Sequence, residues 1–130
     1  MSQDSVIVFV CEHGAAKSIV AAAYFNKFAV ERGLKLRATA RGTNPDNELS
    51  AHAVAGLRKD GLTPFEVFPQ KLSLEDLESA QRIVSFCELP EEYQQKAIVE
   101  KWDNIPPISE NYEKARYAML EQLNELLNRV

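Results

Sequence analysis

The chain has 130 residues, of which 45% are hydrophobic and 26% are charged, and its formal net charge is -4 at pH 7. These values are typical of one globular domain over residues 1–130, and the acidic balance argues against nucleic acid or an anionic membrane as a partner. No apolar run approaches the roughly 20 residues needed to cross a bilayer, and residues 1–5 lack the features of a signal peptide, so we expect a cytoplasmic protein. Two cysteines are too few for a disulfide framework or a Cys-rich zinc site, and we expect neither a metal nor an organic cofactor.

The first half of the chain predicts two strands and two helices. Residues 5–11 (SVIVFVC) form a continuous apolar run, as in a strand covered on both faces. Residues 17–32 carry apolar side chains at helical spacing, and Gly33 suits the cap at the carboxyl end of that helix. Residues 34–40 alternate as a second strand, residues 42–47 form a turn-rich loop, and residues 50–60 are helical until Gly61.

The second half predicts three more strands, at residues 64–68, 82–87 and 97–102. Helices are expected at 73–79, where Ser73 and Asp76 are spaced nearly as a capping box, at 109–129, and as a short turn at 90–96. Strands that alternate with helices indicate a doubly wound α/β fold, a four- to five-stranded parallel sheet with helices on both faces. Such sheets bind ligands beyond the carboxyl ends of their strands, where Cys11 and Cys87 both fall.

The segment after the first strand has the features of an anion-binding loop. A tight loop between a parallel strand and a helix directs several backbone N–H groups and the helix dipole toward one point. Cys11 at its start is expected to be a nucleophile in the same field, which favours the thiolate. Gly14 permits a positive φ, Lys17 adds a positive charge, and Ser18 either caps the helix or donates a hydrogen bond to the thiolate.

From the residues alone, a cysteine at a strand end is more often a small buried side chain than a catalyst. The oxyanion-binding residues predicted from this loop are Glu12, His13, Gly14, Ala15, Ala16, Lys17 and Ser18. Within this set, Glu12 is expected to point away from an anion, and His13 either orients substrate or faces solvent.

The loop, Cys-x5-Lys-Ser, resembles the Cys-x5-Arg-Ser loop of low-molecular-weight protein-tyrosine phosphatases and of the thioredoxin-coupled arsenate reductases that share their fold. Residues 40–43 (ARGT) are similar to the family's Ser-Ala-Gly-Thr, and residues 69–72 (PQKL) to its Pro-x-x-Leu. Residues 50–63 are similar to its segment of helix, glycine and short apolar strand. The resemblance covers most of the chain and implies the phosphotyrosine protein phosphatase I-like fold.

The chain departs from the family at three places. Lys17 stands where the family has arginine, and a lysine is a point charge without the planar fork that grips an oxyanion bidentately. His13 and Gly14 replace the family's Gly-Asn. The family's general acid, an Asp followed by Pro before the last helix, has no plain counterpart in residues 102–108 (WDNIPPI), where Asp103 lies about one turn upstream of the prolines. The expected catalytic residues are therefore Cys11, Lys17 and Asp103.

Three further side chains are candidate auxiliary residues. Arg41 is expected either to supply the guanidinium that position 17 lacks or to lie on the surface. Cys87 matches the first resolving cysteine of the arsenate reductases, but the usual third cysteine is absent from residues 88–96, and a buried structural thiol fits equally well. Trp102 and Tyr93 are candidates for the mouth of the pocket, with packing in the core as the alternative for Trp102.

These residues leave three functions open. The first is a phosphohydrolase that forms a phosphocysteine at Cys11 and acts on a phosphorylated protein or a small phosphate ester. The second is an arsenate reductase that uses Cys11 and Cys87 with thioredoxin, glutaredoxin or a small thiol as donor. The third is a regulatory protein that binds phosphate or arsenate with weak or no catalysis.

Overall fold

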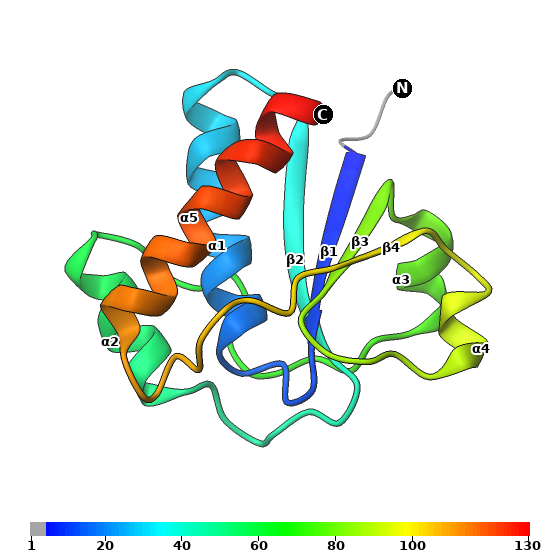
Figure 1. The fold of residues 1–130 in the computed structure, drawn as a ribbon, viewed down its shortest axis with the longest axis horizontal. Coiled ribbons are helices and arrows are strands. Elements are labelled where there is room, and N and C mark those ends of the chain that lie inside the picture. Colours follow the sequence, from blue (N-terminus) through cyan, green and yellow to red (C-terminus); the bar gives the residue numbers. More distant parts are fainter. Residues whose placement is uncertain (1–4) are drawn as a thin grey trace.

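The computed structural model describes residues 5–130, whose strands and helices alternate along the chain (Figure 1). Residues 1–4, on which part of the signal-peptide interpretation rests, lie outside the described residues. The strands are β1 (Ser5–Cys11), β2 (Leu36–Gly42), β3 (Arg82–Ser85) and β4 (Val99–Lys101). The helices are α1 (Lys17–Glu31), α2 (Ala51–Lys59), α3 (Leu74–Ser79), α4 (Glu91–Gln94) and α5 (Tyr112–Arg129). None of the described helices is long and apolar enough to span a membrane.

The four described strands form one parallel sheet in the order β2-β1-β3-β4. β1 pairs with β2 from Ser5 opposite Leu36 to Cys11 opposite Gly42, and it pairs with β3 on its other side. The chain therefore leaves β1 toward one edge of the sheet and later returns to fill the other edge. This reversal beside β1 is where ligands bind in doubly wound folds, and the expected fold class is confirmed.

The core consists of two apolar clusters, one on each face of the sheet. Ile7, Phe9 and Cys11 of β1 belong to the cluster that includes α1, α2 and α5. Val8 and Val10 belong to the second cluster, with α3 and the segment around α4. Because alternate side chains of a strand point to opposite faces, a strand buried on both faces needs the unbroken apolar run of the sequence.

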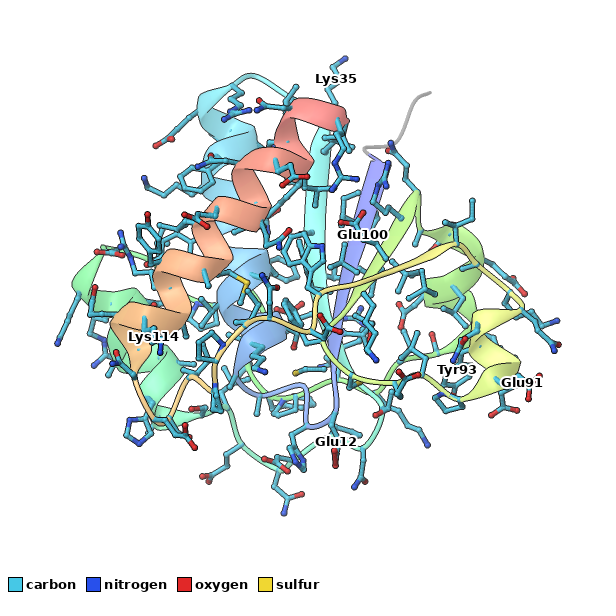
Figure 2. All side chains as sticks on the ribbon, in the orientation of Figure 1. Glu12, Lys35, Glu91, Tyr93, Glu100 and Lys114 are labelled. Carbon is cyan, nitrogen blue, oxygen red and sulfur yellow. The ribbon has the colours of Figure 1, made fainter. Side chains whose placement is uncertain are left out.

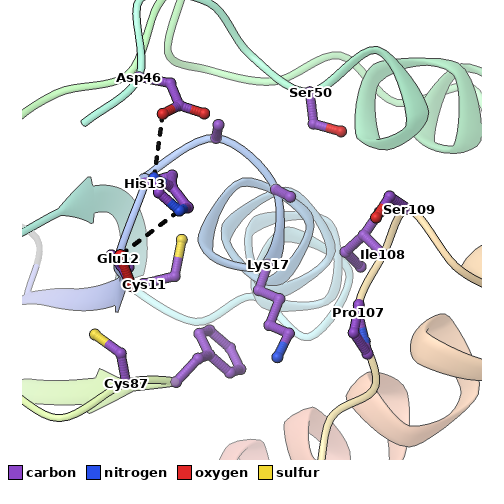
Figure 3. A pocket seen from close by; sticks show the side chains of 13 residues that line it. Cys11, Glu12, His13, Lys17, Asp46, Ser50, Cys87, Pro107, Ile108 and Ser109 are labelled. Carbon is purple, nitrogen blue, oxygen red and sulfur yellow. Dashed lines mark ion pairs between the residues drawn. The ribbon is translucent and has the colours of Figure 1, made fainter. Parts of the chain in front are cut away.

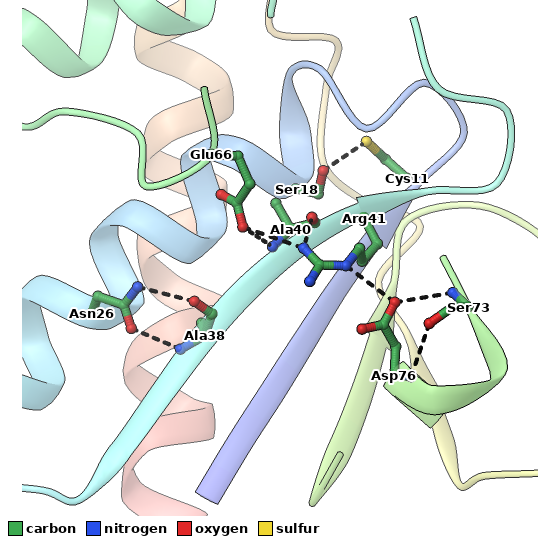
Figure 4. Close-up of polar contacts among 9 residues, drawn as sticks. All are labelled: Cys11, Ser18, Asn26, Ala38, Ala40, Arg41, Glu66, Ser73 and Asp76. Atoms are coloured by element: carbon green, nitrogen blue, oxygen red, sulfur yellow. Dashed lines mark hydrogen bonds and ion pairs between the residues drawn. The ribbon is translucent and has the colours of Figure 1, made fainter. Parts of the chain in front are cut away.

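Side chains satisfy the outer edge of β2. Asn26 on α1 accepts a hydrogen bond from the Ala38 N–H at 2.7 Å and donates to the Ala38 carbonyl at 3.1 Å. The Ala40 N–H donates to Glu66 Oε2 at 2.9 Å, and Arg41 Nη1 donates to the Ala40 carbonyl at 2.8 Å (Figure 4). These backbone groups therefore have partners inside the molecule.

The prediction of a strand at residues 64–68 is wrong. This segment is irregular, with Phe65 and Val67 exposed by 79% and 87%, whereas Glu66 between them is only 6% exposed. The alternating pattern is thus present but inverted: the charged residue turns inward, where it accepts the Ala40 N–H, and the apolar residues turn outward. Pro64 begins the segment and Pro69 follows it, and neither offers an N–H to a neighbouring strand.

Other boundaries differ from the predictions by a few residues. β2 runs to Gly42 rather than residue 40, and β3 ends at Ser85, two residues before Cys87. Gly33 follows α1 with a φ of 68°, as predicted. The capping box of α3 is also confirmed, because the Ser73 hydroxyl accepts the Asp76 N–H and the Asp76 carboxylate accepts the Ser73 N–H.

Candidate active site

The loop of residues 12–16, between β1 and α1, borders a pocket of about 370 Å³ at the carboxyl ends of the strands (Figure 3). Asp46 and Ser50 line it on one side, Phe86 and Cys87 lie beyond the end of β3, and residues 107–109 approach from the segment before α5. Figure 2 shows Glu12 at this end of the molecule and Lys35 at the opposite end. The pocket therefore lies where the strand order predicts a ligand site.

The carbonyl groups of the loop bond to the segment that follows β2. Backbone N–H groups of residues 43–50 donate to the carbonyls of Cys11, Glu12, His13 and Ala15 at distances of 2.7–3.2 Å. Within the described chain, no acceptor is recorded for the backbone N–H groups of residues 12–18. With its carbonyls occupied and its N–H groups unpaired at the start of a helix, the loop is suited to bind an oxyanion.

Two glycines let the loop lie directly against the end of β2. Gly14 has a φ of 63°, and a Cβ built on it would lie 2.9 Å from the Gly42 nitrogen. A Cβ on Gly42 would lie 2.6 Å from the Gly14 nitrogen, closer than any Cβ approaches another atom. Gly42 is itself fixed by backbone hydrogen bonds to Gln70 and Leu72 at 2.8 and 2.9 Å. Neither glycine can carry a side chain without displacing the loop.

The Cys11 thiol lies at the base of this loop and is 8% exposed. Its Sγ is 3.1 Å from Oγ of Ser18, a fully buried residue (Figure 4). The helix α1 begins without a side-chain cap, so Ser18 faces the thiol rather than capping the helix. A hydroxyl in this position donates a hydrogen bond to the thiolate once the proton of Cys11 has left.

Lys17 is the cationic residue of the pocket lining. Figure 3 shows its side chain extending from the start of α1 toward Pro107. Among the described residues, no carboxylate lies within ion-pair distance of its ammonium group. Its charge is thus not neutralised by a neighbouring side chain before an anion enters.

Cys87 lines the same pocket from the end of β3, the strand next to β1. Both thiols are free. Burial raises the pKa of the Cys87 thiol, and the hydrogen bond with Ser85 opposes this shift without cancelling it. At neutral pH Cys87 is therefore held in its protonated form.

His13 lies on the rim of the pocket between two carboxylates. Its Nδ1 is 3.1 Å from Asp46 Oδ1, and its Nε2 is 3.7 Å from Glu12 Oε2. Each of the three side chains is more than half exposed. Glu12 is also part of the pocket lining, and the partnership of His13 with Asp46 was not foreseen from the sequence.

The structure does not bring Asp103 to the pocket. Asp103 is exposed and is absent from the lining, where the segment before α5 contributes Pro107, Ile108 and Ser109. The chain turns away after β4 because Trp102 and Ile105 are anchored in the core. This geometry places the expected general acid outside the site.

Arg41 also lies outside the pocket, which corrects the hypothesis that it replaces the missing guanidinium. Its Nε is 3.1 Å from Asp76 Oδ2, and its Nη1 is 3.5 Å from Glu66 and bonded to the Ala40 carbonyl (Figure 4). Arg41 pairs with Val10 in the sheet, so its side chain leaves β2 one residue before the end that faces the loop. The guanidinium stabilises the outer edge of the sheet.

The two aromatic candidates for the pocket mouth are packed elsewhere. Trp102 is 3% exposed, contacts the rings of Phe9 and Phe86, and donates Nε1–H to Glu100 at 2.6 Å. Tyr93 packs against the second apolar cluster. The core alternative holds for Trp102, and neither residue lines the pocket.

Sequence reasoning missed two parts of the lining. Asp46 belongs to residues 42–47, which their turn-forming composition marked only as a loop, and Ser50 was marked only as the start of a helix. Both residues could have been found from the pairing of β1 with β2, because this pairing brings the segment after β2 close to the end of β1. Phe86 was assigned to a strand, but β3 ends before it.

The fold and the pocket define an α/β protein with a buried thiol at the base of a loop that is suited to bind an anion. The family model of low molecular weight phosphotyrosine protein phosphatase matches residues 6–125, and the chain belongs to this family. No curated protein matches the chain.

Solved structures agree with the fold. YfkJ from Bacillus subtilis superposes with a TM-score of 0.84 at 17% identity, over 99% of this chain and 95% of that one. A low molecular weight protein tyrosine phosphatase from T. tengcongensis has a TM-score of 0.79 at 20% identity, over 97% and 99% of the two chains. A thioredoxin-dependent arsenate reductase from Corynebacterium glutamicum has a TM-score of 0.72 at 18% identity, over 99% of this chain and 65% of that one. At these identities the likeness concerns the fold.

Proposed function

We propose that this protein is a thiol-dependent phosphohydrolase that acts on phosphate monoesters. One observation carries the proposal: the Cys11 sulfur lies 3.1 Å from Ser18 Oγ at the base of a loop whose N–H groups have no acceptor in the described chain. A phosphoryl group held by those N–H groups has its phosphorus next to the thiol. This arrangement favours attack by sulfur, since the nucleophile and the oxyanion donors meet at one point.

The reaction proceeds in two displacements at phosphorus. The Cys11 thiolate forms an S–P bond as the P–O bond to the leaving group breaks, and the leaving oxygen takes up a proton. Water then attacks phosphorus, the S–P bond breaks, and its electron pair returns to the sulfur with release of phosphate. The loop N–H groups and Lys17 neutralise charge on the three equatorial oxygens, and Ser18 stabilises the departing thiolate.

The test is hydrolysis of an aryl phosphate by the wild type and by variants of Cys11 and Lys17. We expect phosphate release by the wild type and none by Cys11→Ser. Loss of the charge in Lys17→Met should raise KM or lower kcat by about 10-fold or more, and Lys17→Arg should retain or exceed wild-type turnover because a guanidinium binds two oxygens at once. Phosphate release that is unchanged in Cys11→Ser would overturn the proposal.

Arsenate reduction is the second candidate, and the position of Cys87 in the same pocket favours it. The Cys11 thiolate would attack arsenic(V) with loss of hydroxide, and Cys87 would then attack the Cys11 sulfur. A disulfide forms, two electrons pass to arsenic, and arsenite leaves. A dithiol protein such as thioredoxin or glutaredoxin would reduce the disulfide.

Cys87→Ser separates the two candidates. For a reductase, the variant loses arsenite production with a dithiol donor, whereas for a phosphohydrolase it keeps aryl phosphate turnover. If neither activity is found but phosphate protects Cys11 from alkylation, the protein is an oxyanion-binding regulator.

The location and the substrate are part of the proposal. The two free thiols support placing the protein in the cytoplasm, and the matched family supports a phosphorylated protein as the substrate.

A further inference from the structure

We propose that His13 is the general acid and base of the phosphohydrolase reaction and that Asp46 is its positioning residue. This inference rests on the proposed function and assigns the proton transfers that it requires. The departing oxygen of an unactivated ester leaves as an alkoxide unless it is protonated, so a proton donor must reach the pocket.

The lining of the pocket restricts which group donates. The segment before α5 contributes Pro107, Ile108 and Ser109, and none of these is a carboxylic acid. In the described lining, the only carboxylates are those of Glu12 and Asp46, and both lie on the rim beside His13. The titratable groups that face the imidazole are therefore these two carboxylates, with Lys17 and the two thiols elsewhere in the pocket.

The contacts of His13 distinguish its two nitrogens. Nδ1 is 3.1 Å from Asp46 Oδ1, and the Asp46 N–H also donates to the His13 carbonyl at 3.0 Å, so the two residues hold one another by side chain and backbone. Nε2 is 3.7 Å from Glu12, beyond hydrogen-bond length. Asp46 thus fixes the proton on Nδ1 and leaves Nε2 as the nitrogen that exchanges its proton with substrate.

The position of the ring matches this role. His13 follows Cys11 by two residues and lines the same pocket with more than half of its side chain exposed, and Figure 3 shows its ring between Glu12 and Asp46. A phosphate bound by the loop N–H groups directs its ester oxygen away from the thiol, toward the mouth, because attack occurs opposite the leaving group. The leaving oxygen and the imidazole are therefore on the same side of the phosphorus.

Protons balance over the two steps. In the first step the imidazolium gives its Nε2 proton to the leaving oxygen as the P–O bond breaks, and His13 becomes neutral with its proton on Nδ1. In the second step the attacking water gives a proton to Nε2 as the S–P bond breaks. Cys11 returns as a thiolate and His13 as an imidazolium, ready for the next ester.

The test compares two esters that differ in their need for an acid. Phenyl phosphate has a poor leaving group, and 2,4-dinitrophenyl phosphate has one that departs without a proton. We expect His13→Gln to lower kcat/KM, which reports only the first displacement, by about 100-fold or more for phenyl phosphate, the range typical of general acid catalysis, and far less for the dinitrophenyl ester. Asp46→Asn should move the ratio of the two rates in the same direction by a smaller factor.

The other histidine provides the matched control. His52 is exposed on α2 and is absent from the lining, so His52→Gln should leave the ratio unchanged. Equal losses of kcat/KM on both esters in His13→Gln, or no loss on either, would overturn the assignment to His13 while Cys11-dependent turnover stood. Absence of turnover in the wild type would instead remove the proposed function, and the inference with it.

Discussion

At the scale of single residues, the site depends on what surrounds one sulfur atom. The Cys11 sulfur has a hydroxyl at 3.1 Å and the unpaired N–H groups of the loop above it. A buried thiolate without such donors is costly, since desolvation disfavours the charged form. In the proposed reaction, Ser18 is therefore needed to stabilise the Cys11 thiolate.

Replacing Ser18 by alanine should slow the alkylation of Cys11. A hydrogen bond to a charged group contributes about 1.5–3 kcal/mol, so we expect the rate with iodoacetamide at pH 7 to fall about 10-fold or more in Ser18→Ala. The rate is measured in a Cys87→Ser background, where Cys11 is the one remaining cysteine of the sequence. Ser79→Ala, on the exposed face of α3, should alkylate at the parent rate; a Ser18→Ala rate equal to it would contradict the prediction.

The sequence predicted the residues that the loop itself carries and not those that depend on where a long side chain turns. Cys11 and Lys17 lie in one short segment, so local order was enough to place them in the pocket, and Ser18 follows directly and contacts the Cys11 sulfur. Arg41 and Asp103 were assigned by their distance along the chain from strand ends. The Arg41 side chain instead lies beside Asp76, which is remote in sequence. The position of Asp103 depends on the packing of Trp102 in the core, which the local sequence does not reveal.

At the scale of elements, the site exists because a loop and a strand end meet backbone to backbone. Gly14 and Gly42 approach so closely that neither has room for a methyl group. This contact fixes the height of the loop over the sheet, and it is reinforced by the four hydrogen bonds that residues 43–50 donate. The loop is thereby preorganised to bind an anion before one arrives.

Gly42→Ala should weaken phosphate binding as well as stability. Its Cβ would lie 2.6 Å from a backbone nitrogen, so the loop must move, at a cost of about 1–3 kcal/mol. Gly33→Ala is the matched control: Gly33 has a φ of 68° but no atom within 4 Å of its Cβ position, so strain of about 1 kcal/mol arises far from the pocket. Thermal unfolding should detect both variants, whereas protection of Cys11 by phosphate should decline only in Gly42→Ala.

The elements were predicted well where packing agrees with local pattern. The apolar run of β1 and the capping box of α3 each have a single structural solution, and both are confirmed. Residues 64–68 failed because an alternating pattern does not say which set of side chains faces inward. There a hydrogen bond to an edge N–H outweighed the burial of Phe65 and Val67.

At the scale of the whole molecule, a cluster of charges joins the far edge of the sheet to the last helix. Glu100 on β4 accepts two hydrogen bonds from Arg129 at 2.9 and 3.0 Å, one from Trp102 at 2.6 Å and one from Arg82 at 3.4 Å. These contacts, the pair with Arg129 above all, lower the pKa of the Glu100 carboxyl. The end of α5 is thus attached to the sheet by a group that titrates in acid.

Stability should accordingly decline in acid through Glu100. Because the pKa of this carboxyl is lower in the folded state, its contribution is complete above the unfolded value of about 4.3 and is lost as the pH falls through the folded value. Between pH 6 and pH 3, the thermal midpoint of the wild type should fall further than that of Glu100→Gln. Glu121→Gln, an exposed change on α5, should follow the wild type; equal slopes for Glu100→Gln and wild type would contradict the assignment.

The outer edge of β2 bears on whether copies of this protein associate with one another. An open strand edge invites a second chain to extend the sheet, which is how many folded proteins begin to aggregate. Here the outward groups of Ala38 and Ala40 are already occupied by Asn26, Glu66 and Arg41. Arg41, which the sequence suggested as a ligand for substrate, instead occupies an edge carbonyl to which a second chain would otherwise bond. Loss of Asn26 or Glu66 should therefore cause precipitation on storage before it lowers activity.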